Sequence, residues 1–298
     1  QRFSLDKAAY DDFERGDDDT YSVPIDDATR AGLTVGDIDR VVIEKSRDGA
    51  AGGWFLKGVT LVVNGRTVVR ERSIDLTHVR TIDGEFTAQA FITTDLDDNQ
   101  ITAFHPGAMS HSHLNDVGQV AGCTLGLVAP DGRDGMVKHA AGFAAAGIPM
   151  LFDPGQGLPM FDGAELLDFV SKSTWIAVND YEGQLLSERT GLSHSEIASK
   201  VRALIVTRGG EGSVIHAGGR EHVIPAATPA AVVDPTGCGD AYRAGLIFGL
   251  MNGLDWETTG RVASLMGAIK IATAGTQLHR FTMDEFRDRY RAAFGRTL

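Results

Sequence analysis

From residue 123 onward, short apolar runs alternate regularly with longer segments that have a helical pattern of apolar residues. The apolar runs lie at 123–130, 148–154, 173–180, 202–210 and 230–237, and the helical segments lie at 135–147, 163–171, 182–188, 193–202, 239–252 and 256–274. Strand, helix and strand in this order predict a parallel sheet with helices on both faces. We therefore expect an α/β fold whose ligand binds at the carboxyl ends of the strands.

Two residue pairs indicate where helices begin. Ser193 with Glu196, and Thr282 with Glu285, have the spacing of a capping box. In this motif each side chain accepts a hydrogen bond from the backbone of the other residue. Helices are therefore expected to start next to Ser193 and Thr282.

The first 72 residues have a different character. They include an acidic, turn-rich stretch and strand-like runs at 39–46 and 57–71, and Asn64-Gly65 is a strong hairpin signal. We expect residues 1–72 to form an acidic β-rich segment or partial sandwich, followed by the α/β body over 73–298.

A second hairpin is expected just after this segment. Residues 85–95 and 99–107 are strand-like, and Asp97-Asp98-Asn99 provides turn residues between them.

Charge and composition narrow the class of ligand. The net charge of -12 argues against nucleic acid or an anionic membrane as the main partner, so a small molecule is expected. No apolar run approaches the roughly 18 residues of a membrane span, and the first residues do not resemble a signal peptide. The two cysteines, Cys123 and Cys238, suggest no disulfide framework. A cytoplasmic protein is expected.

The stretch VVDPTGCGDAYRAGL, residues 232–246, predicts a loop between a strand and a helix. Val232 and Val233 resemble the end of a buried strand, and an apolar helix follows the turn. The first amides of a helix lack intrahelical partners and carry the positive end of its dipole, so they attract anions. The small residues that would let a phosphate approach this backbone are Gly237, Cys238 and Gly239.

Asp240 directly follows this anion-binding loop. A carboxylate there would repel a bound anion, so anion binding alone does not explain it. A general base that faces an incoming hydroxyl group does explain it. The alternative is that Asp240 is simply a first-turn helix residue favoured by the helix dipole.

Four motifs, in order, resemble those of the ribokinase-like (pfkB) sugar and nucleoside kinases, most of all the bacterial adenosine kinases, over about residues 73–298. They are VVDPTGCGDAYRAG, VNDYE at 178–182, VTRGGEGS at 206–213 and GAIKIATAGTQ at 267–277. In the first motif Cys238 stands where alanine is usual. The resemblance implies a ribokinase-like fold and ATP-dependent phosphorylation of a nucleoside or sugar hydroxyl, with adenosine as the first substrate to try.

The resemblance also implies roles for individual residues. Asp240 would accept the hydroxyl proton, while the backbone amides of residues 237–239 stabilise the transferring phosphoryl group. Asn179 and Glu182 would organise Mg²⁺, largely through water. Asp234 would fix the loop. The residues that would border ATP are Thr207, Gly209 and Gly212, with Ala268 and Gln277 in the stretch that lines the adenine.

These roles have plainer alternatives. Asn179 and Glu182 can be a strand-end turn followed by a helix start, and residues 207–210 can be a plain hairpin turn. Cys238 is expected to be a small filler rather than a nucleophile, because nothing beside it in the sequence supplies a base. Three histidines match no familiar zinc spacing and are expected to be ordinary loop residues: His105, His111 and His113.

The resemblance does not extend to the start of the chain. A complete kinase of this family begins with a strand carrying a substrate-binding aspartate and a glycine-rich stretch, and neither is found before Ser73. Residues 10–69 instead resemble a PLAT-type β-sandwich segment. The carboxylates of residues 17–19 would then bind Ca²⁺, or they form a solvated acidic turn.

Three interpretations of the whole chain follow. In the first, which we prefer, the chain is a natural or artificial fusion of a sandwich fragment to a kinase body. In the second, it is a kinase whose diverged N-terminus rebuilds the substrate site. Otherwise it is a non-catalytic nucleotide-binding or interaction protein. A parallel sheet that lacks strands exposes an edge, so self-association, for example as a homodimer, is expected unless residues 1–72 cover that edge.

Overall fold

The computed structural model describes residues 60–63, 66–70, 78–94 and 100–298. The chain divides into two units, residues 1–108 and 109–298. Several sequence-based predictions lie outside the described residues: the strand at 39–46, the acidic residues 17–19, and the turn residues 64–65 and 97–99.

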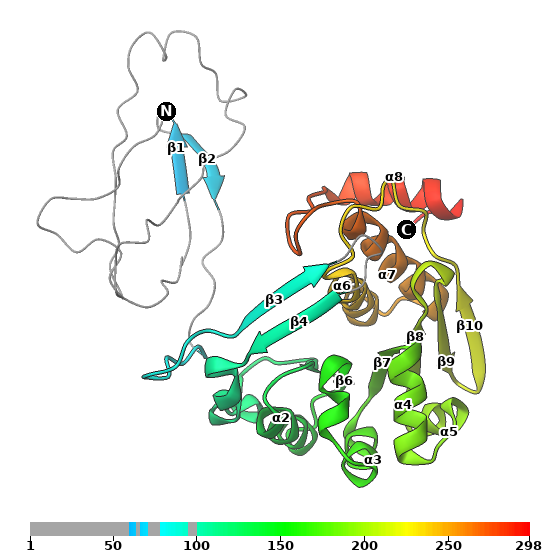
Figure 1. Ribbon diagram of the computed structural model, residues 1–298. Coiled ribbons are helices and arrows are strands. Elements are labelled where there is room, and N and C mark those ends of the chain that lie inside the picture. The colour runs from blue at the N-terminus through cyan, green and yellow to red at the C-terminus, as the bar shows by residue number, and fades with distance from the viewer. Residues whose placement is uncertain (1–59, 64–65, 71–77, 95–99) are drawn as a thin grey trace, which may run out of the picture. The chain divides into compact units, whose positions relative to one another are not determined.

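The first unit contains the two expected hairpins (Figure 1). Strand β1 (Thr60–Val63) pairs antiparallel with β2 (Arg66–Arg70), and β3 (Gln89–Thr94) pairs antiparallel with β4 (Gln100–His105). Both hairpin predictions are confirmed, because two extended runs joined by turn-forming residues pair locally.

The second unit is built on a six-stranded sheet with the order β10-β9-β8-β7-β6-β5. Its strands are β5 (Gly126–Val128), β6 (Met150–Phe152), β7 (Trp175–Asn179), β8 (Ala203–Thr207), β9 (Ser213–Ala217) and β10 (Arg220–Ile224). Strands β5 to β8 are parallel, whereas β9 and β10 are antiparallel. The sheet is therefore mostly parallel, as expected, with a meander at one edge.

Helices cover both faces of this sheet. Helices α2 (Arg133–Ala145), α3 (Gly163–Lys172), α4 (Asp180–Thr190) and α5 (His194–Lys200) share one apolar cluster with the sheet. Helices α6 (Cys238–Met251) and α7 (Trp256–Ile271) share the other, and α8 (Met283–Phe294) packs on α7. Within β7, Ile176 faces the first cluster and Ala177 the second, because successive strand residues point to opposite faces.

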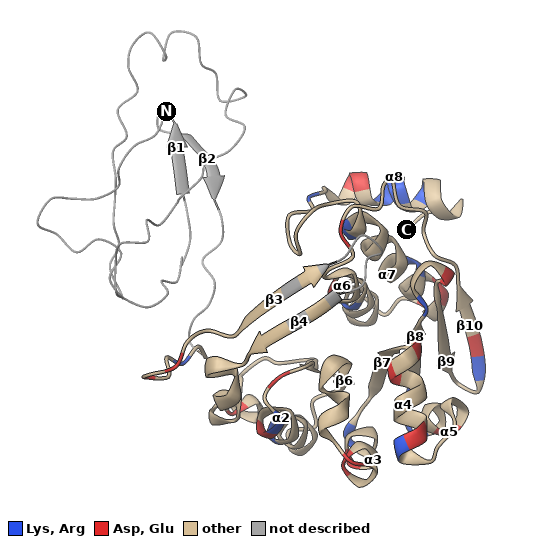
Figure 2. Cartoon of the chain, viewed as in Figure 1, with Lys and Arg blue, Asp and Glu red and all other residues tan. Residues whose placement is uncertain are grey.

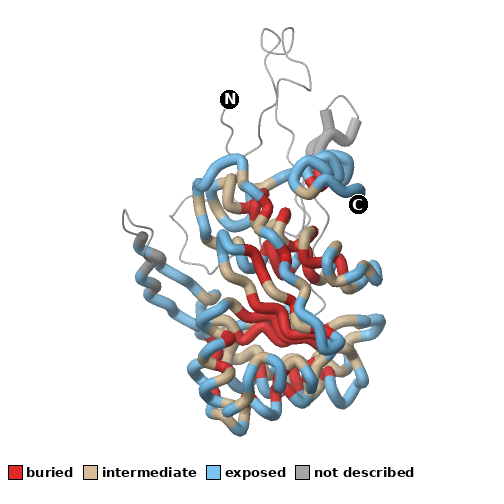
Figure 3. Tube along the Cα trace, turned by 90° about the vertical axis from the view of Figure 1, so that its right-hand side faces the viewer, coloured by how far each residue is buried: buried red, intermediate tan, exposed pale blue. Residues whose placement is uncertain are grey.

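The buried residues concentrate in the central strands (Figure 3). Strands β6, β7 and β8 contain no charged residue, and the charges of the second unit lie on helices, on turns and on β10 (Figure 2). Continuous apolar strands are typical of a parallel sheet that is covered on both faces. Among the described residues, no helix has the length and apolar character that crossing a bilayer requires.

Both predicted capping boxes are present. The Ser193 side chain accepts from the Glu196 amide at the start of α5, and the Thr282 side chain accepts from the Glu285 amide at the start of α8. Two further boxes start α3 and α4, formed by the pairs Asp162 with Glu165 and Asn179 with Glu182. Local side-chain chemistry therefore sets these helix starts.

The strand expected at 230–237 is absent, and this prediction is wrong. Val232 is 69% exposed and Val233 is 54% exposed, so neither ends a buried strand. The amides of Val233 and Asp234 both donate to the carbonyl of Ile271, at 2.9 and 3.1 Å. The segment is thus a loop attached to the end of α7 rather than a member of the sheet.

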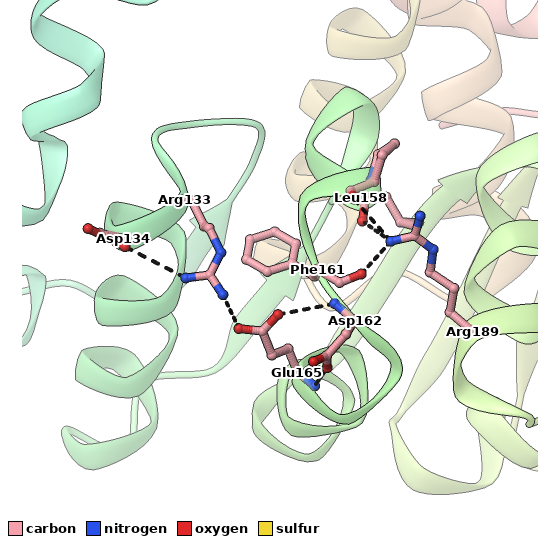
Figure 4. A network of polar contacts seen from close by, with 8 residues as sticks. Arg133, Asp134, Leu158, Phe161, Asp162, Glu165 and Arg189 are labelled. Atoms are coloured by element: carbon pink, nitrogen blue, oxygen red, sulfur yellow. Dashed lines mark hydrogen bonds and ion pairs between the residues drawn. The ribbon is translucent and has the colours of Figure 1, made fainter.

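A polar network holds the loop between β6 and α3 (Figure 4). The guanidinium of Arg133 pairs with Glu165 and lies 5.6 Å from the centroid of the Phe161 ring. Arg189 of α4 donates to the carbonyl of Pro159 at 3.0 Å and to that of Phe161. These contacts hold the loop that follows β6 between three helices.

Candidate active site

The carboxyl ends of three adjacent parallel strands carry polar residues. Asp153 follows β6, Asn179 ends β7 and Thr207 ends β8. Asn179 is directly opposite Thr207 in the register of β7 and β8. Parallel strands end at the same edge, so these side chains gather where α/β proteins bind their ligands.

Asp153 is joined to helix α6 by a buried ion pair with Arg243. The guanidinium donates from Nε to Oδ2 at 3.0 Å and from Nη2 to Oδ1 at 3.1 Å. Asp153 is 8% exposed and Arg243 is 7% exposed. Two parallel hydrogen bonds fix both distance and orientation, so the pair sets how α6 approaches the end of β6.

The same pair interacts electrostatically with two predicted site residues. Burial raises the pKa of the Asp153 carboxyl, Arg243 lowers it, and the negative charge of Asp240 raises it further. Burial also raises the pKa of Glu182, the charge of Asp153 raises it further, and the charge of Arg243 lowers it. Asp153, Glu182, Asp240 and Arg243 therefore form one electrostatic environment around the N-terminus of α6.

Helix α6 begins as the sequence predicts. Gly237 is its N-cap residue with a φ of 83°, and no side chain caps the helix there. The Cys238 amide donates to the carbonyl of Pro235 at 3.1 Å, which closes the turn. Asp240 lies in the first helical turn and is exposed. An uncapped helix N-terminus with small residues suits a phosphate group.

Asn179 and Glu182 form the capping box of α4. The Glu182 amide donates to Asn179 Oδ1 at 2.7 Å, and the Asn179 amide donates to Glu182 Oε2 at 2.8 Å. Asn179 and Glu182 therefore do form a helix start, as the plainer alternative expected. The Asn179 side-chain amide also donates to Glu182 Oε1 at 2.9 Å. Each carboxylate oxygen of Glu182 thus accepts one hydrogen bond, and because each has a second lone pair, the capping box does not exclude a metal role.

The turn after β8 connects two antiparallel strands, so the hairpin alternative for residues 207–210 also describes the geometry. Gly209 has a φ of 53° with open space around it, whereas Gly212 has a φ of 87°. A Cβ atom at Gly212 would lie 2.1 Å from the carbonyl oxygen of Ile224. Packing against β10 therefore requires glycine at 212, whatever the turn binds.

Asp234 joins two loops beside α6. Its Oδ1 accepts from the Thr236 amide at 2.9 Å, and its Oδ2 accepts from the Gly275 amide at 2.9 Å. The backbone and side-chain hydrogen bonds from Thr236 are the main reason that the pKa of Asp234 is lowered. The carboxylate therefore links the loop before α6 to the loop after α7.

The two residues expected near adenine lie in different surroundings. Ala268 is 9% exposed and packs in the cluster between α7 and α8. Gln277 is exposed, and its carbonyl accepts from Arg280 at 2.8 Å.

The remaining candidates are three histidines and the two cysteines. His105 ends β4, and the rings of His111 and His113 lie 6.2 Å apart in a 3-10 helix, Gly107–Leu114. Within the part of the chain that the structure describes, no group of three or more His, Cys, Asp or Glu residues could hold a metal ion. Both cysteines are free thiols, and burial raises the pKa of Cys238.

Three charged residues next to these candidates were not predicted from the sequence: Asp153, Arg243 and Lys270. Asp153 follows an apolar run, as Asn179 does, so its position at a strand end was a usable signal. Arg243 and Lys270 are charges within otherwise apolar helical stretches. Such a charge predicts a buried partner, although it does not identify that partner.

Comparison with known proteins matches residues 66–281 to the pfkB family of carbohydrate kinases. The nucleoside kinase of Burkholderia thailandensis, solved in complex with inosine, is 52% identical, with a TM-score of 0.74 over 76% of this chain and 74% of that chain. It has also been solved in complex with ADP-inosine. The nucleoside kinase of Methanocaldococcus jannaschii is 30% identical over 225 residues, covering 74% of this chain and 72% of that protein.

The expected likeness to adenosine kinases is weaker. The adenosine kinase of Sinorhizobium meliloti is 21% identical, with a TM-score of 0.57 over 71% of this chain and 68% of that chain. This similarity shows a common fold alone. The nucleoside kinases are nearer relatives than the adenosine kinase that the sequence motifs suggested.

Proposed function

Because this chain belongs to the pfkB family of carbohydrate kinases, we propose that it transfers the γ-phosphoryl group of ATP to a hydroxyl group of a nucleoside. The observation that carries the proposal is the 52% identity to a nucleoside kinase solved with inosine. The ends of β6, β7 and β8 and the N-terminus of α6 supply the expected position for such a reaction. Inosine and adenosine are the first substrates to test.

Asp240 is the proposed general base. It lies in the first turn of α6, is exposed, and directly follows the small residues of the loop. In this role it accepts the proton of the attacking hydroxyl, while the amides of residues 237–239 stabilise charge on the transferring phosphoryl group. Phosphoryl transfer depends mainly on positioning and electrostatics, so a rigid loop suits it.

Asn179 and Glu182 are the proposed magnesium-organising residues. Their oxygen atoms are of the type that Mg²⁺ prefers, and Mg²⁺ binds through retained water molecules. The ion neutralises phosphate charge when bound. Glu182 is half-buried, and partial removal from water strengthens the attraction between its carboxylate and a bound cation.

The proposed nucleotide contacts follow from the motifs. Asp234 orders the loop before α6 through its bonds to Thr236 and Gly275. The further residues assigned to ATP are Thr207, Gly209, Gly212, Ala268 and Gln277.

The test is ADP release from Mg·ATP by the full chain, with and without adenosine or inosine, with ribose as a comparison acceptor. Nucleoside-dependent release that Asp240→Asn removes supports the proposal. Release with ribose but not with nucleosides would assign a sugar kinase instead. ADP binding without transfer to any acceptor would favour the non-catalytic nucleotide-binding alternative.

A further inference from the structure

Lys270, in the last turn of α7, has a completely buried side chain, with 0% of its surface exposed. Its ammonium donates to the carbonyl of Asp234 at 2.7 Å and to that of Thr273 at 3.4 Å, and lies 3.9 Å from Asp234 Oδ1. A lysine is almost never fully buried unless its charge is paired. All three oxygen atoms belong to two loops, one before α6 and one after α7.

Two further hydrogen bonds join the loop before α6 to the last residue of α7 and to the loop after it. The Gly275 amide donates to the Asp234 carboxylate, and the Asp234 amide donates to the carbonyl of Ile271. A Cβ atom at Gly237 would lie 3.3 Å from the Cβ of Thr276. The ammonium of Lys270 thus lies among the contacts between the loop that leads to the N-cap residue of α6 and the loop after α7.

Stability alone does not account for a lysine here. Taking an ammonium out of water is costly, and apolar residues of similar volume often stabilise such a position as well or better. The charge lies beside the predicted phosphate loop, and it acts to lower the pKa of Cys238 within that loop, against the larger effect of burial. A fixed positive charge next to an anion-binding helix N-terminus adds to the attraction of the helix dipole.

We propose that Lys270 is a positioning residue for phosphoryl transfer, in which its buried ammonium holds the Asp234 loop and the following N-terminus of α6 against residues 273–276. The inference rests on the proposed function for its effect on rate, but the tether itself does not. Without the ammonium the carbonyls of Asp234 and Thr273 lose their shared partner, and the loop before α6 loosens.

The first experiment compares Lys270→Met with the unmodified chain. Met keeps an unbranched apolar side chain but removes the charge. We expect faster amide hydrogen exchange in residues 233–237 and 273–276. We also expect kcat to fall by about 10- to 100-fold with little change in the KM for nucleoside, because misplaced reacting groups lower rate more than binding. Lys200→Met, at the exposed end of α5, is the matched control and should change neither quantity.

A rescue experiment separates charge from packing. Lys270→Ala vacates the space of the side chain beyond Cβ, which propylammonium fills with its charge and 1-propanol fills without it. Recovery of kcat with propylammonium alone is the expected result. Equal recovery with both compounds would overturn the proposal, since volume rather than charge would then matter.

Two further outcomes decide the proposal. Unchanged exchange and unchanged kcat in Lys270→Met, or in Lys270→Gln if the Met variant does not fold, would overturn it. If the unmodified chain phosphorylates no nucleoside, the proposed function fails, and the hydrogen exchange of the two segments alone then decides whether Lys270 is the tether.

Discussion

The guanidinium of Arg243 and the carboxylate of Asp153, 90 residues apart in the sequence, form two parallel hydrogen bonds in the interior of the protein. One residue lies on α6, a single turn after Asp240, and the other lies at the end of β6. The pair therefore connects the helix that carries the proposed base to the sheet edge where the ligand is expected to bind.

Breaking this ion pair should strongly destabilise the fold. Arg243→Met leaves a buried carboxylate without its partner, which typically costs about 3–5 kcal/mol of unfolding free energy. Replacing both partners, as Arg243→Met with Asp153→Leu, should cost clearly less. Chemical denaturation of the two single variants and the double variant measures this, with Arg287→Met on the exposed surface of α8 as the control. A double variant as unstable as the sum of the single variants would show that the pair is not coupled.

Replacing the proposed base should stop the reaction without unfolding the protein. Asp240→Asn keeps the size of the side chain and should lower kcat by about 10²–10⁴-fold, the usual contribution of a general base. Steady-state kinetics and ADP binding by calorimetry check this. Asp284→Asn changes the corresponding first-turn acid of α8 and should leave turnover unchanged. Equal effects of the two substitutions would contradict the role of Asp240 as general base and leave it as a first-turn residue favoured by the helix dipole.

The backbone conformation of Gly237 should be required for both stability and turnover. Its φ of 83° is left-handed, so Gly237→Ala costs about 1–2 kcal/mol, and the new Cβ also contacts Thr276. Gly253 has a φ of 64°, and beyond its chain neighbours no atom of the described residues lies within 4 Å of the place a Cβ would take. Gly253→Ala should therefore cost only the backbone strain. Thermal unfolding and kcat are measured for both. Full turnover in Gly237→Ala would argue against the phosphate-loop role.

The thiol of Cys238 should be unreactive and dispensable. Burial raises its pKa, so little thiolate is present near neutral pH. Alkylation by iodoacetamide, followed by peptide mass spectrometry, should be much slower in the folded protein than in urea. Cys238→Ala should keep its turnover and lose no more than about 1 kcal/mol of stability. Loss of turnover in this variant would give the thiol a role that backbone amides cannot supply.

His216 should make the second unit less stable in mild acid. Burial is the main cause of its lowered pKa, so as the pH falls the unfolded chain takes up the proton before the folded chain does. Stability is therefore full above the unfolded pKa of about 6.5 and declines below it. His216→Gln should lose less stability than the unmodified chain between about pH 7.5 and pH 5.5 in urea titrations. His222→Gln, on the adjacent strand, is the control, and the same gain in both would contradict the assignment.

Local patterns account for most of what was predicted correctly. The apolar runs of β5 to β8, the capping boxes of α5 and α8 and the loop before α6 each depend on residues a few positions apart. The failure at 230–237 has the same origin. Two adjacent valines have strand character wherever they occur, whereas here both are exposed and the Val233 amide bonds to Ile271 of α7 rather than to a strand.

Local residue patterns are enough to predict the alternation of strands and helices, the family motifs and the position of Asp240 in the first turn of a helix. The contacts of Arg243 with Asp153 and of Lys270 with Asp234 depend instead on how the chain packs in three dimensions. Periodicity and capping act over one or two turns, whereas the partner of a buried charge depends on strand order and on which helix covers which face. A charged residue in an apolar segment therefore signals a partner, and the packing of the sheet selects it.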